Sequence, residues 1–280
     1  MACMKIFTAF ISIIMWSNVA FAENSTGIPK RIVSLAPSMT EIMFSLGLGD
    51  HIVADTTYCD HPEEAKAKPK IGSMSSPSLE AIVSMKPDIV IMSMDDNPRE
   101  IYDRLQGLGI RCYVWTARKI NDLPQGIREL SAVLQVPEKG NELAAHIEQE
   151  IGALAAVRKK TQAERKKVLF IVWPEPLIVA GPGTAIDDAL ALLGMKNAAS
   201  AAQTIYPRYS IEEVIRQEPE MLFIGMATGM DMRTVSQGIV KRLSSVPAVR
   251  NGAVCYVGEG LYRIGPRIVE GIKELAQCVH

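Results

Sequence analysis

SLEAIVSMKPDIVIM, residues 78–92, and SIEEVIRQEPEMLFI, residues 210–224, are two copies of one sequence pattern. Aligned without a gap, the copies share identical residues at Ser78 and Ser210, Glu80 and Glu212, and Pro87 and Pro219. In both, a serine that can accept a backbone N–H starts a short helix, apolar residues three and four apart give it one buried face, and the proline ends it. A run of four apolar residues follows, which is typical of a strand buried on both faces. Each copy therefore predicts a helix followed by a buried strand, and the pair predicts two similar α/β lobes.

The rest of the chain alternates between strand and helix in the same way. Strand patterns occur at residues 31–37, 52–57 and 111–115 in the first half, and at 168–173 and 253–257 in the second. Helix patterns separate them, among them one that Asn97 is expected to cap. Such alternation is typical of parallel sheets.

Between Pro137 and Lys166 the alternation stops. This segment has no strand pattern and no internal proline, and its strong helix formers carry apolar residues at helical spacing. It predicts one helix of roughly 40 Å. The predicted fold is therefore α/β, with an N-terminal lobe at residues 23–136, a connecting helix at 137–166 and a C-terminal lobe at 167–280. Each lobe is expected to hold a mostly parallel sheet flanked by helices.

Composition excludes some classes of function. The chain has 280 residues, of which 48% are hydrophobic and 22% charged, so it can build a substantial core. Its 30 basic and 31 acidic residues give no overall positive field, and nucleic acid is not an expected partner. The sequence contains no zinc-cluster spacing, phosphate loop or GxSxG motif.

The first 22 residues have the pattern of a secretory signal peptide. Lys5 supplies the positive charge, an apolar run extends from Ile6 to Trp16, and Ala20-Phe21-Ala22 matches a small-x-small cleavage site. Cleavage after Ala22 predicts an exported, soluble protein, and a bacterial periplasm fits best. An uncleaved membrane anchor is the alternative, although the run is short for a membrane span.

Export permits disulfides, and four cysteines remain after the predicted cleavage: Cys59, Cys112, Cys255 and Cys278. Cys112 and Cys255 lie in equivalent strands of the two lobes, so they are expected to be buried and far apart. A bond between Cys255 and Cys278 is geometrically possible. Buried free thiols are the alternative, and for Cys112 they are the favoured interpretation.

Loops that follow predicted strands carry the side chains of a candidate pocket. In parallel α/β sheets, ligands bind beyond the carboxyl ends of strands, so a crevice between two lobes is the expected site. Aromatic, methionine and charged residues gather on five such loops: Tyr58 to His61, Met74 to Ser76, Trp173, Tyr206 to Tyr209, and Glu259 to Arg263. This set predicts a pocket for a large, partly apolar ligand. The alternative is that Trp173 and Tyr206 only cover the core.

From the residues alone, the roles of two other pairs of side chains stay undecided. Cys59 and His61 share one loop and could both reach a metal, as in an exported metal-dependent enzyme, but two ligands do not close a tetrahedral site, and no metal site is predicted. Glu80 and Glu212 have two interpretations. A carboxylate in the first helical turn favours the helix dipole, but a matched acid on each lobe also suits docking to a basic, two-fold partner.

Several segments together resemble a known family. They are RIVSLAPSMTEIMFSLG, SLEAIVSMKPDIVI, GPGTAIDDALALLG, YPRYSIEEVIRQEPE and YRIGPRIVEGIKEL. In this order they are similar to the periplasmic cobalamin-binding proteins of ABC importers. Those proteins belong to a wider class that binds siderophores, haem and corrinoids between two lobes joined by one long helix.

The resemblance implies ligand capture rather than catalysis, with no cofactor and with ABC importer membrane subunits as partners of a monomer. It implies that Glu80 and Glu212 form salt bridges with arginines of two membrane subunits. It also implies corrinoid contacts from Tyr58, Met74, Trp173, Tyr206, Glu259 and Arg263. Cobalamin or a related corrinoid is the implied ligand.

This sequence departs from the family at three places. Met74 and Tyr206 stand where tryptophan is usual, so cobinamide or another chelate stays open as ligand. A ferric siderophore or haem is the nearest alternative, since Arg208, Arg263 and Arg267 could bind anionic groups. The segment LALLGMKN lacks the cysteine that pairs with the C-terminal cysteine of a relative, which implies that Cys278 is unpaired.

Overall fold

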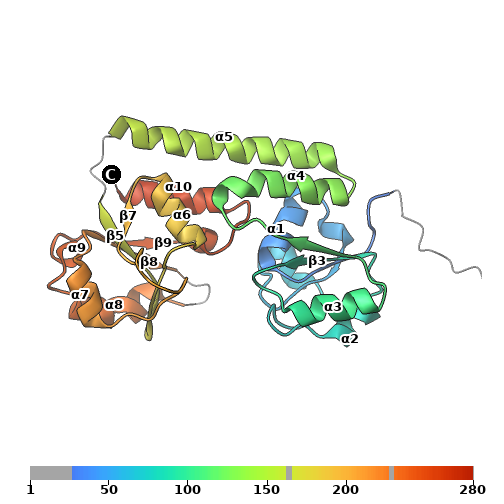
Figure 1. Cartoon of the computed structure of the whole chain (residues 1–280), viewed down its shortest axis with the longest axis horizontal. Coiled ribbons are helices and arrows are strands. Elements are labelled where there is room, and N and C mark those ends of the chain that lie inside the picture. Colours follow the sequence, from blue (N-terminus) through green and yellow to red (C-terminus); the bar gives the residue numbers. More distant parts are fainter. Residues whose placement is uncertain (1–26, 162–165, 227–229, 280) are drawn as a thin grey trace, which may run out of the picture.

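Two α/β lobes lie side by side beneath one long helix, α5 (Pro137–Thr161), in the computed structural model (Figure 1). The structure describes residues 27–161, 166–226 and 230–279. The predicted signal peptide and its cleavage site therefore lie outside the described residues. Within those ranges, no helix is both long and apolar enough to cross a membrane.

The N-terminal lobe is built on a parallel sheet with strand order β2-β1-β3-β4. Its strands are β1 (Ile32–Ser34), β2 (Ile52–Ala54), β3 (Ile89–Ser93) and β4 (Cys112–Trp115). Its helices are α1 (Pro37–Ser45), α2 (Leu79–Ser84) and α3 (Arg99–Gly107), with 3-10 turns η1 (Gly49–His51) and η2 (Glu63–Ala67). β1 is shorter than its predicted strand because α1 already begins at Pro37, and proline is well suited to the first turn of a helix.

The C-terminal lobe has the strand order β6-β5-β8-β9, and β7 also pairs with β5. Its strands are β5 (Lys167–Pro174), β6 (Leu177–Val179), β7 (Lys196–Asn197), β8 (Met221–Gly225) and β9 (Val254–Val257). Its helices are α6 (Ala185–Leu192), α7 (Ile211–Gln217), α8 (Met232–Arg242), α9 (Pro247–Arg250) and α10 (Ile268–Cys278), with the 3-10 turn η4 (Glu259–Tyr262). β6 runs antiparallel to β5, whereas β7, β8 and β9 join in parallel.

The two copies of the repeated pattern form equivalent parts of the two sheets. The first copy is α2 and β3, and the second is α7 and β8. β3 lies between β1 and β4, and β8 lies between β5 and β9, so each copy supplies an inner strand. Both strands are buried along their whole length, as continuous apolar runs require. The predicted α/β fold with mostly parallel sheets is confirmed.

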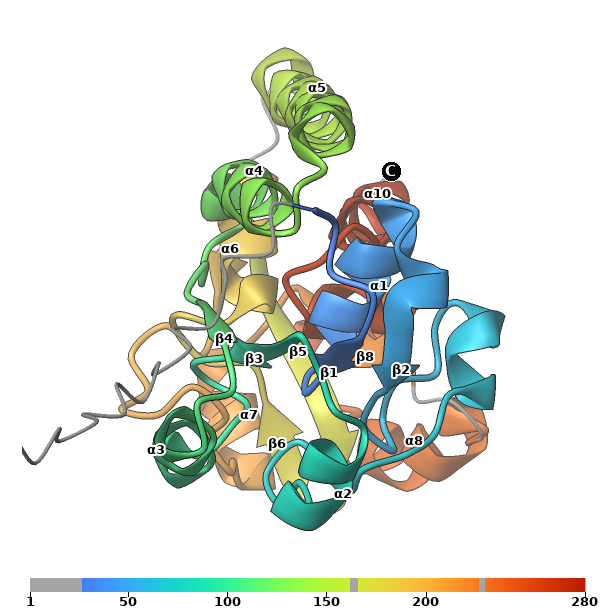
Figure 2. The ribbon, with the colours of Figure 1, turned by 90° about the vertical axis from the view of Figure 1, so that its right-hand side faces the viewer.

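A layer of helices joins the lobes. α4 (Leu123–Val133), preceded by the 3-10 turn η3 (Ile120–Asp122), and α10 lie between α5 and the sheets (Figures 1 and 2). α4 was not predicted from the sequence. Leu130 of α4, Ile147 of α5 and Leu275 of α10 belong to one hydrophobic cluster that also contains residues of both sheets. Because the lobes share this close-packed cluster, large movements between them are expected to be costly.

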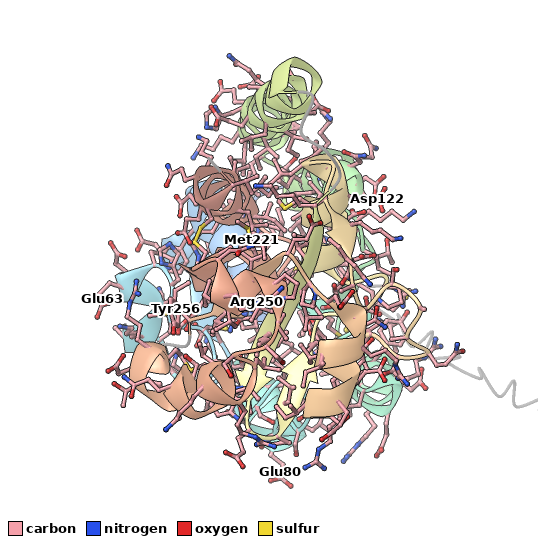
Figure 3. All side chains as sticks on the ribbon, turned by 90° about the vertical axis from the view of Figure 1, so that its left-hand side faces the viewer. Glu63, Glu80, Asp122, Met221, Arg250 and Tyr256 are labelled. Atoms are coloured by element: carbon pink, nitrogen blue, oxygen red, sulfur yellow. A yellow bond between two sulfur atoms is a disulfide. The ribbon has the colours of Figure 1, made fainter. Side chains whose placement is uncertain are left out.

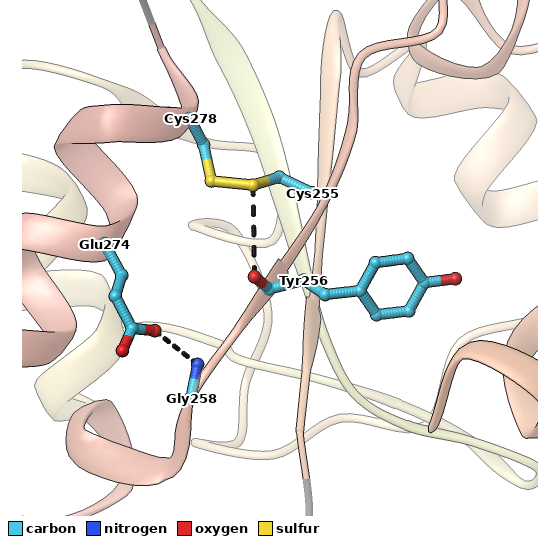
Figure 4. The surroundings of a disulfide bond; sticks show 5 residues. All are labelled: Cys255, Tyr256, Gly258, Glu274 and Cys278. Carbon is cyan, nitrogen blue, oxygen red and sulfur yellow. Dashed lines mark hydrogen bonds between the residues drawn. A yellow bond between two sulfur atoms is a disulfide. The ribbon is translucent and has the colours of Figure 1, made fainter. Parts of the chain in front are cut away.

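One expectation about the cysteines is wrong. Cys278 is not unpaired, because it forms a disulfide with Cys255 (Figure 4). The bond joins the end of α10 to β9, whose Cα atoms approach to 6.1 Å at this pair, a separation that a disulfide spans readily. Cys112 is a free thiol, as favoured, but Cys112 and Cys255 are only half-buried rather than buried as expected. Partial burial raises the pKa of the Cys112 thiol.

Candidate ligand-binding cleft

A cavity of about 580 Å³ lies where the two lobes face each other. Its size falls in the usual range for small-molecule sites. The N-terminal lobe contributes the residues that end or follow β3 and β4, together with the start of α1: Ser38, Ser93, Asp95, Asp96, Trp115, Ala117 and Arg118. The C-terminal lobe contributes residues of three loops and the start of α6: Gly183, Thr184, Ala185, Ile205, Tyr206, Tyr262, Arg263 and Ile264. On the N-terminal lobe, the cavity therefore lies at the carboxyl ends of parallel strands, as predicted. On the C-terminal lobe, Tyr262 to Ile264 follow the parallel strand β9, whereas Gly183 to Ala185 follow the antiparallel strand β6.

Aromatic rings from both lobes line this cleft. Trp115 ends β4 and donates its indole N–H to the carbonyl of Ala117 at 3.1 Å. Tyr262 packs edge-on against Phe170 of β5, with ring centroids 6.3 Å apart. Burial raises the pKa of Tyr262, so its phenol stays protonated at neutral pH and can donate a hydrogen bond. Flat apolar faces with a few hydroxyl donors suit a large, partly apolar ligand.

Charged groups stand at the edge of the cleft. Arg118 holds Asp95 through two nitrogens, with its Nε 2.9 Å and its NH2 2.5 Å from carboxylate oxygens. Both side chains are more than half exposed, so this pair adds little stability and can rearrange around a ligand. Arg263 comes from the opposite lobe and presents a second guanidinium to the same space.

The lobes are also joined by a buried ion pair behind the cleft. Glu41 of α1 is only 5% exposed and accepts two hydrogen bonds from Arg267, at 3.0 Å and 2.6 Å. These residues are 226 positions apart and belong to different lobes. Hydrogen bonding to Glu41 raises the pKa of Arg267. Sequence reasoning missed Glu41, because its partner is set by the packing of the lobes.

The predicted ligand contacts fall into two groups. Tyr206 and Arg263 line the cavity, and Glu259 begins the turn that carries Tyr262 and Arg263. The other three lie outside the lining of this cavity. Tyr58 is 52% exposed on the loop after β2.

Met74 and Trp173 take part in local structure instead. The backbone carbonyl of Met74 accepts a hydrogen bond from the side-chain amide of Asn97 at 3.0 Å. Asn97 therefore does not cap α3 as expected, since its side chain ties together the loops after β1 and β3. Trp173 lies in the β5–β6 hairpin and donates to the carbonyl of Glu175 at 2.8 Å. The roles of both as ligand contacts remain predictions.

Sequence reasoning missed Trp115 and Tyr262, two of the three aromatic residues that line the cavity. Trp115 carried a usable signal, because it ends a predicted strand and so stands at a carboxyl end. Tyr262 lies within the predicted loop Glu259 to Arg263, but the family resemblance implies ligand contacts only for Glu259 and Arg263.

The candidate metal ligands on the loop after β2 do not form a site. Cys59 is buried and lies 3.2 Å from the hydroxyls of both Thr40 and Thr56. Burial raises the pKa of its thiol, which disfavours the thiolate that metals bind. His61 is exposed on the surface. Among the described residues, no group of three or more His, Cys, Asp or Glu is placed to hold a metal ion.

Glu80 and Glu212 lie in the first turns of α2 and α7. Both helices lie on the side of their lobes away from α5 (Figure 1), and Figure 3 places Glu80 at the end of the molecule opposite α5. Both carboxylates are exposed, and Ser78 and Ser210 cap the two helices, so the glutamates are not the caps. Hydrogen bonds from its own backbone N–H and from the Ser210 hydroxyl lower the pKa of Glu212.

This chain belongs to the periplasmic binding protein family, whose family model matches residues 32–260. Within the family it is similar to a vitamin B12-binding protein of Vibrio campbellii, which is 33% identical over 211 residues that cover 75% of this chain and 74% of the relative. The solved structure of the periplasmic vitamin B12-binding protein BtuF of Vibrio cholerae has a TM-score of 0.78 at 25% identity, covering 90% of this chain and 96% of that one. The periplasmic haem-binding protein RhuT from Roseiflexus sp. RS-1 has a TM-score of 0.79 at 30% identity, covering 89% of this chain and 97% of that one.

Proposed function

We propose that this protein captures cobalamin or a related corrinoid between its lobes and delivers it to an ABC importer. The observation that carries the proposal is the cleft between the two lobes, in a chain similar to vitamin B12-binding proteins. A corrinoid is a broad, largely apolar ring edged with amide groups. Tyr206 and Tyr262 offer aromatic faces to such a ring, and the nearly buried Trp115 forms part of the wall of the N-terminal lobe. Arg118 and Arg263 offer donors to the edge of the ring.

Haem is the second candidate, and one feature of the cleft favours it. Tyr206 and Tyr262 both bring a phenol to the cavity, and tyrosine is one of the side chains that hold haem iron. The similarity to a haem-binding protein at 30% identity supports the same alternative. In both cases the function is binding and delivery, not catalysis.

For delivery, we propose that the protein is exported to the periplasm as a monomer and docks through Glu80 and Glu212. Both carboxylates are exposed in the first turns of α2 and α7. Ser78 and Ser210 supply the capping acceptors of the two helices, so the exposed carboxylates can pair with arginines of two membrane subunits.

Calorimetric titration of the purified mature chain tests the ligand. Cyanocobalamin, cobinamide and haemin are titrated in parallel, and a corrinoid is expected to bind most tightly. Tyr206→Ala should weaken that binding about tenfold, because a stacked aromatic contributes roughly 0.5–1.5 kcal/mol beyond the area it buries. Tyr102→Ala is the matched control, since Tyr102 lies on α3 outside the cavity lining. Corrinoid affinity no better than millimolar, with tight haemin binding, would replace the first proposal by the second.

A further inference from the structure

At the lobe junction, the carboxylate of Glu41 lies near two arginines but forms hydrogen bonds with only one of them. Arg267 makes both of its short contacts to Glu41. In contrast, the NH1 of Arg263 lies 3.8 Å from Glu41 and 3.8 Å from Asp60. Distances of this length are too great for a hydrogen bond. Arg267 therefore forms a bidentate pair with Glu41, and the guanidinium of Arg263 is held beside this pair by charge alone.

One guanidinium nitrogen of Arg263, Nη1, lacks a hydrogen-bond acceptor among the described residues. This nitrogen is buried. A buried donor without an acceptor is unfavourable by roughly 1–3 kcal/mol. This nitrogen is closed off from solvent and faces Asp60 as well as Glu41, whereas the guanidinium as a whole lines the cleft, so the other N–H groups of Arg263 are the ones that can reach an oxygen acceptor on a bound ligand. Amide carbonyls and phosphates are acceptors of this kind.

The backbone around the pair keeps the two lobes close. A side chain at Gly265, between the two arginines, would lie 3.6 Å from Ser38 and 3.7 Å from Glu41. The segment 263–267 of the C-terminal lobe thus runs directly against α1 of the N-terminal lobe. Glu41 is the anion at this contact, and it is nearly fully buried there.

We infer that Glu41 is a positioning residue for the cleft. By accepting hydrogen bonds from two nitrogens of Arg267, it fixes the spacing of the lobes and the position of the segment that brings Arg263 to the cleft, where N–H groups of Arg263 other than the buried Nη1 donate to an oxygen of the ligand. This inference rests on the proposed function only in taking a corrinoid as the ligand. Neutralising Glu41 would remove the charged partner of Arg267 and leave Asp60 as the remaining carboxylate beside Arg263, so the segment 263–267 would move away from α1 and carry Arg263 with it.

A double-mutant cycle on ligand affinity tests the coupling. Cyanocobalamin is titrated against the unmodified chain, Glu41→Gln, Arg263→Met and the double variant. Glu41→Gln is expected to weaken binding at least tenfold in the unmodified chain. In the Arg263→Met background the same change should weaken binding less than threefold, because the group that Glu41 positions is already absent. Equal losses in both backgrounds would mean that Glu41 acts only through stability, and would overturn the inference.

A second measurement needs no ligand. Hydrogen exchange is compared in the unmodified chain, in Glu41→Gln and in the control Glu64→Gln, whose carboxyl lines the same surface hollow as Glu41. Glu41→Gln should speed amide exchange in α1 and in residues 263–268, and the control should not. Unchanged exchange in Glu41→Gln would refute the positioning role. If the unmodified chain takes up no corrinoid, the proposed function fails, and the exchange result alone decides the role of Glu41.

Discussion

The two copies of the repeated pattern differ less in backbone than in surroundings. In each, a serine hydroxyl accepts the N–H three residues ahead, at 3.2 Å for Ser78 and 3.1 Å for Ser210. In each, the residue before the proline has a left-handed backbone, with φ of 47° at both Lys86 and Glu218. Because matched positions keep even this uncommon conformation, helix, turn and strand behave as one local unit.

The surroundings differ at both ends of the copies. At the helix end, Arg242 lies near Glu212 and helps to lower its pKa, and both line a surface hollow with Arg208. No ion pair involving Glu80 is present in the described part of the chain. At the strand end, Ser93 of β3 matches Gly225 of β8. The two copies therefore share one backbone fold, whereas their surroundings at the surface and at the cleft differ.

The largest effect is expected on ligand uptake, when the two glutamates of the copies that are proposed to dock to the membrane subunits are changed. Glu80→Arg combined with Glu212→Arg should reduce ligand uptake by cells to background, because like charges would face the arginines proposed on the membrane subunits. Ligand affinity should stay within about twofold, since both residues lie far from the cleft lining. Of the single variants, Glu80→Arg should cost more, because Arg242 already offsets part of the charge of Glu212. Uptake assays and calorimetry measure the two properties.

The control for this prediction carries the same change of net charge. Glu138→Arg with Glu142→Arg alters two exposed acids on α5, on the opposite side of the molecule. Uptake should be unaffected by this pair. If both double variants transport equally well, the docking role of Glu80 and Glu212 is wrong.

An intermediate effect is expected at the strand ends. A β-carbon at Gly225 would lie 1.6 Å from the hydroxyl oxygen of Tyr262, so this strand end must be glycine for the ring to reach the cleft. Gly225→Ala should lower the free energy of unfolding by about 1–3 kcal/mol, as overpacking does, and should weaken ligand binding by displacing the ring. Ser93→Ala, at the matched position, adds no atoms and should be nearly neutral. Denaturant unfolding of both variants decides whether the close approach exists, and similar stabilities would argue against it.

The two copies also show which features of the structure could be predicted from the sequence. The copies could be predicted because capping serines, helix-ending prolines and buried apolar runs act over a few residues. The cleft could be placed for a related reason, since parallel strands put their carboxyl ends at one edge. Even α4, which was overlooked, has local signals in Pro124 and in the spacing of Leu123, Ile127 and Leu130.

The remaining features depend on contacts between distant residues. Glu41 and Arg267 meet only because the lobes pack together. The disulfide between Cys255 and Cys278 likewise requires β9 and α10 to be neighbours. Tyr206 and Arg263 line the cavity whereas Tyr58 does not, although all three lie on loops of the predicted pocket. Strand ends identify the edge of a sheet, but the set of side chains at the cleft depends on how the lobes face each other.

The smallest effect is expected at the helix caps. Ser78→Ala and Ser210→Ala should each lower the free energy of unfolding by about 1 kcal/mol, the usual contribution of a capping hydroxyl. Ser210→Ala should cost slightly more, because its hydroxyl also bonds to Glu212, whose pKa should then rise toward its ordinary value. The control is Ser84→Ala, an exposed serine at the end of α2 whose loss should be nearly neutral, since alanine is the better helix former. A titration of Glu212 by NMR separates the two cap variants. If the pKa of Glu212 stayed unchanged in Ser210→Ala while stability fell equally in both, the copies would be equivalent at their caps and would differ only in the arginines around them.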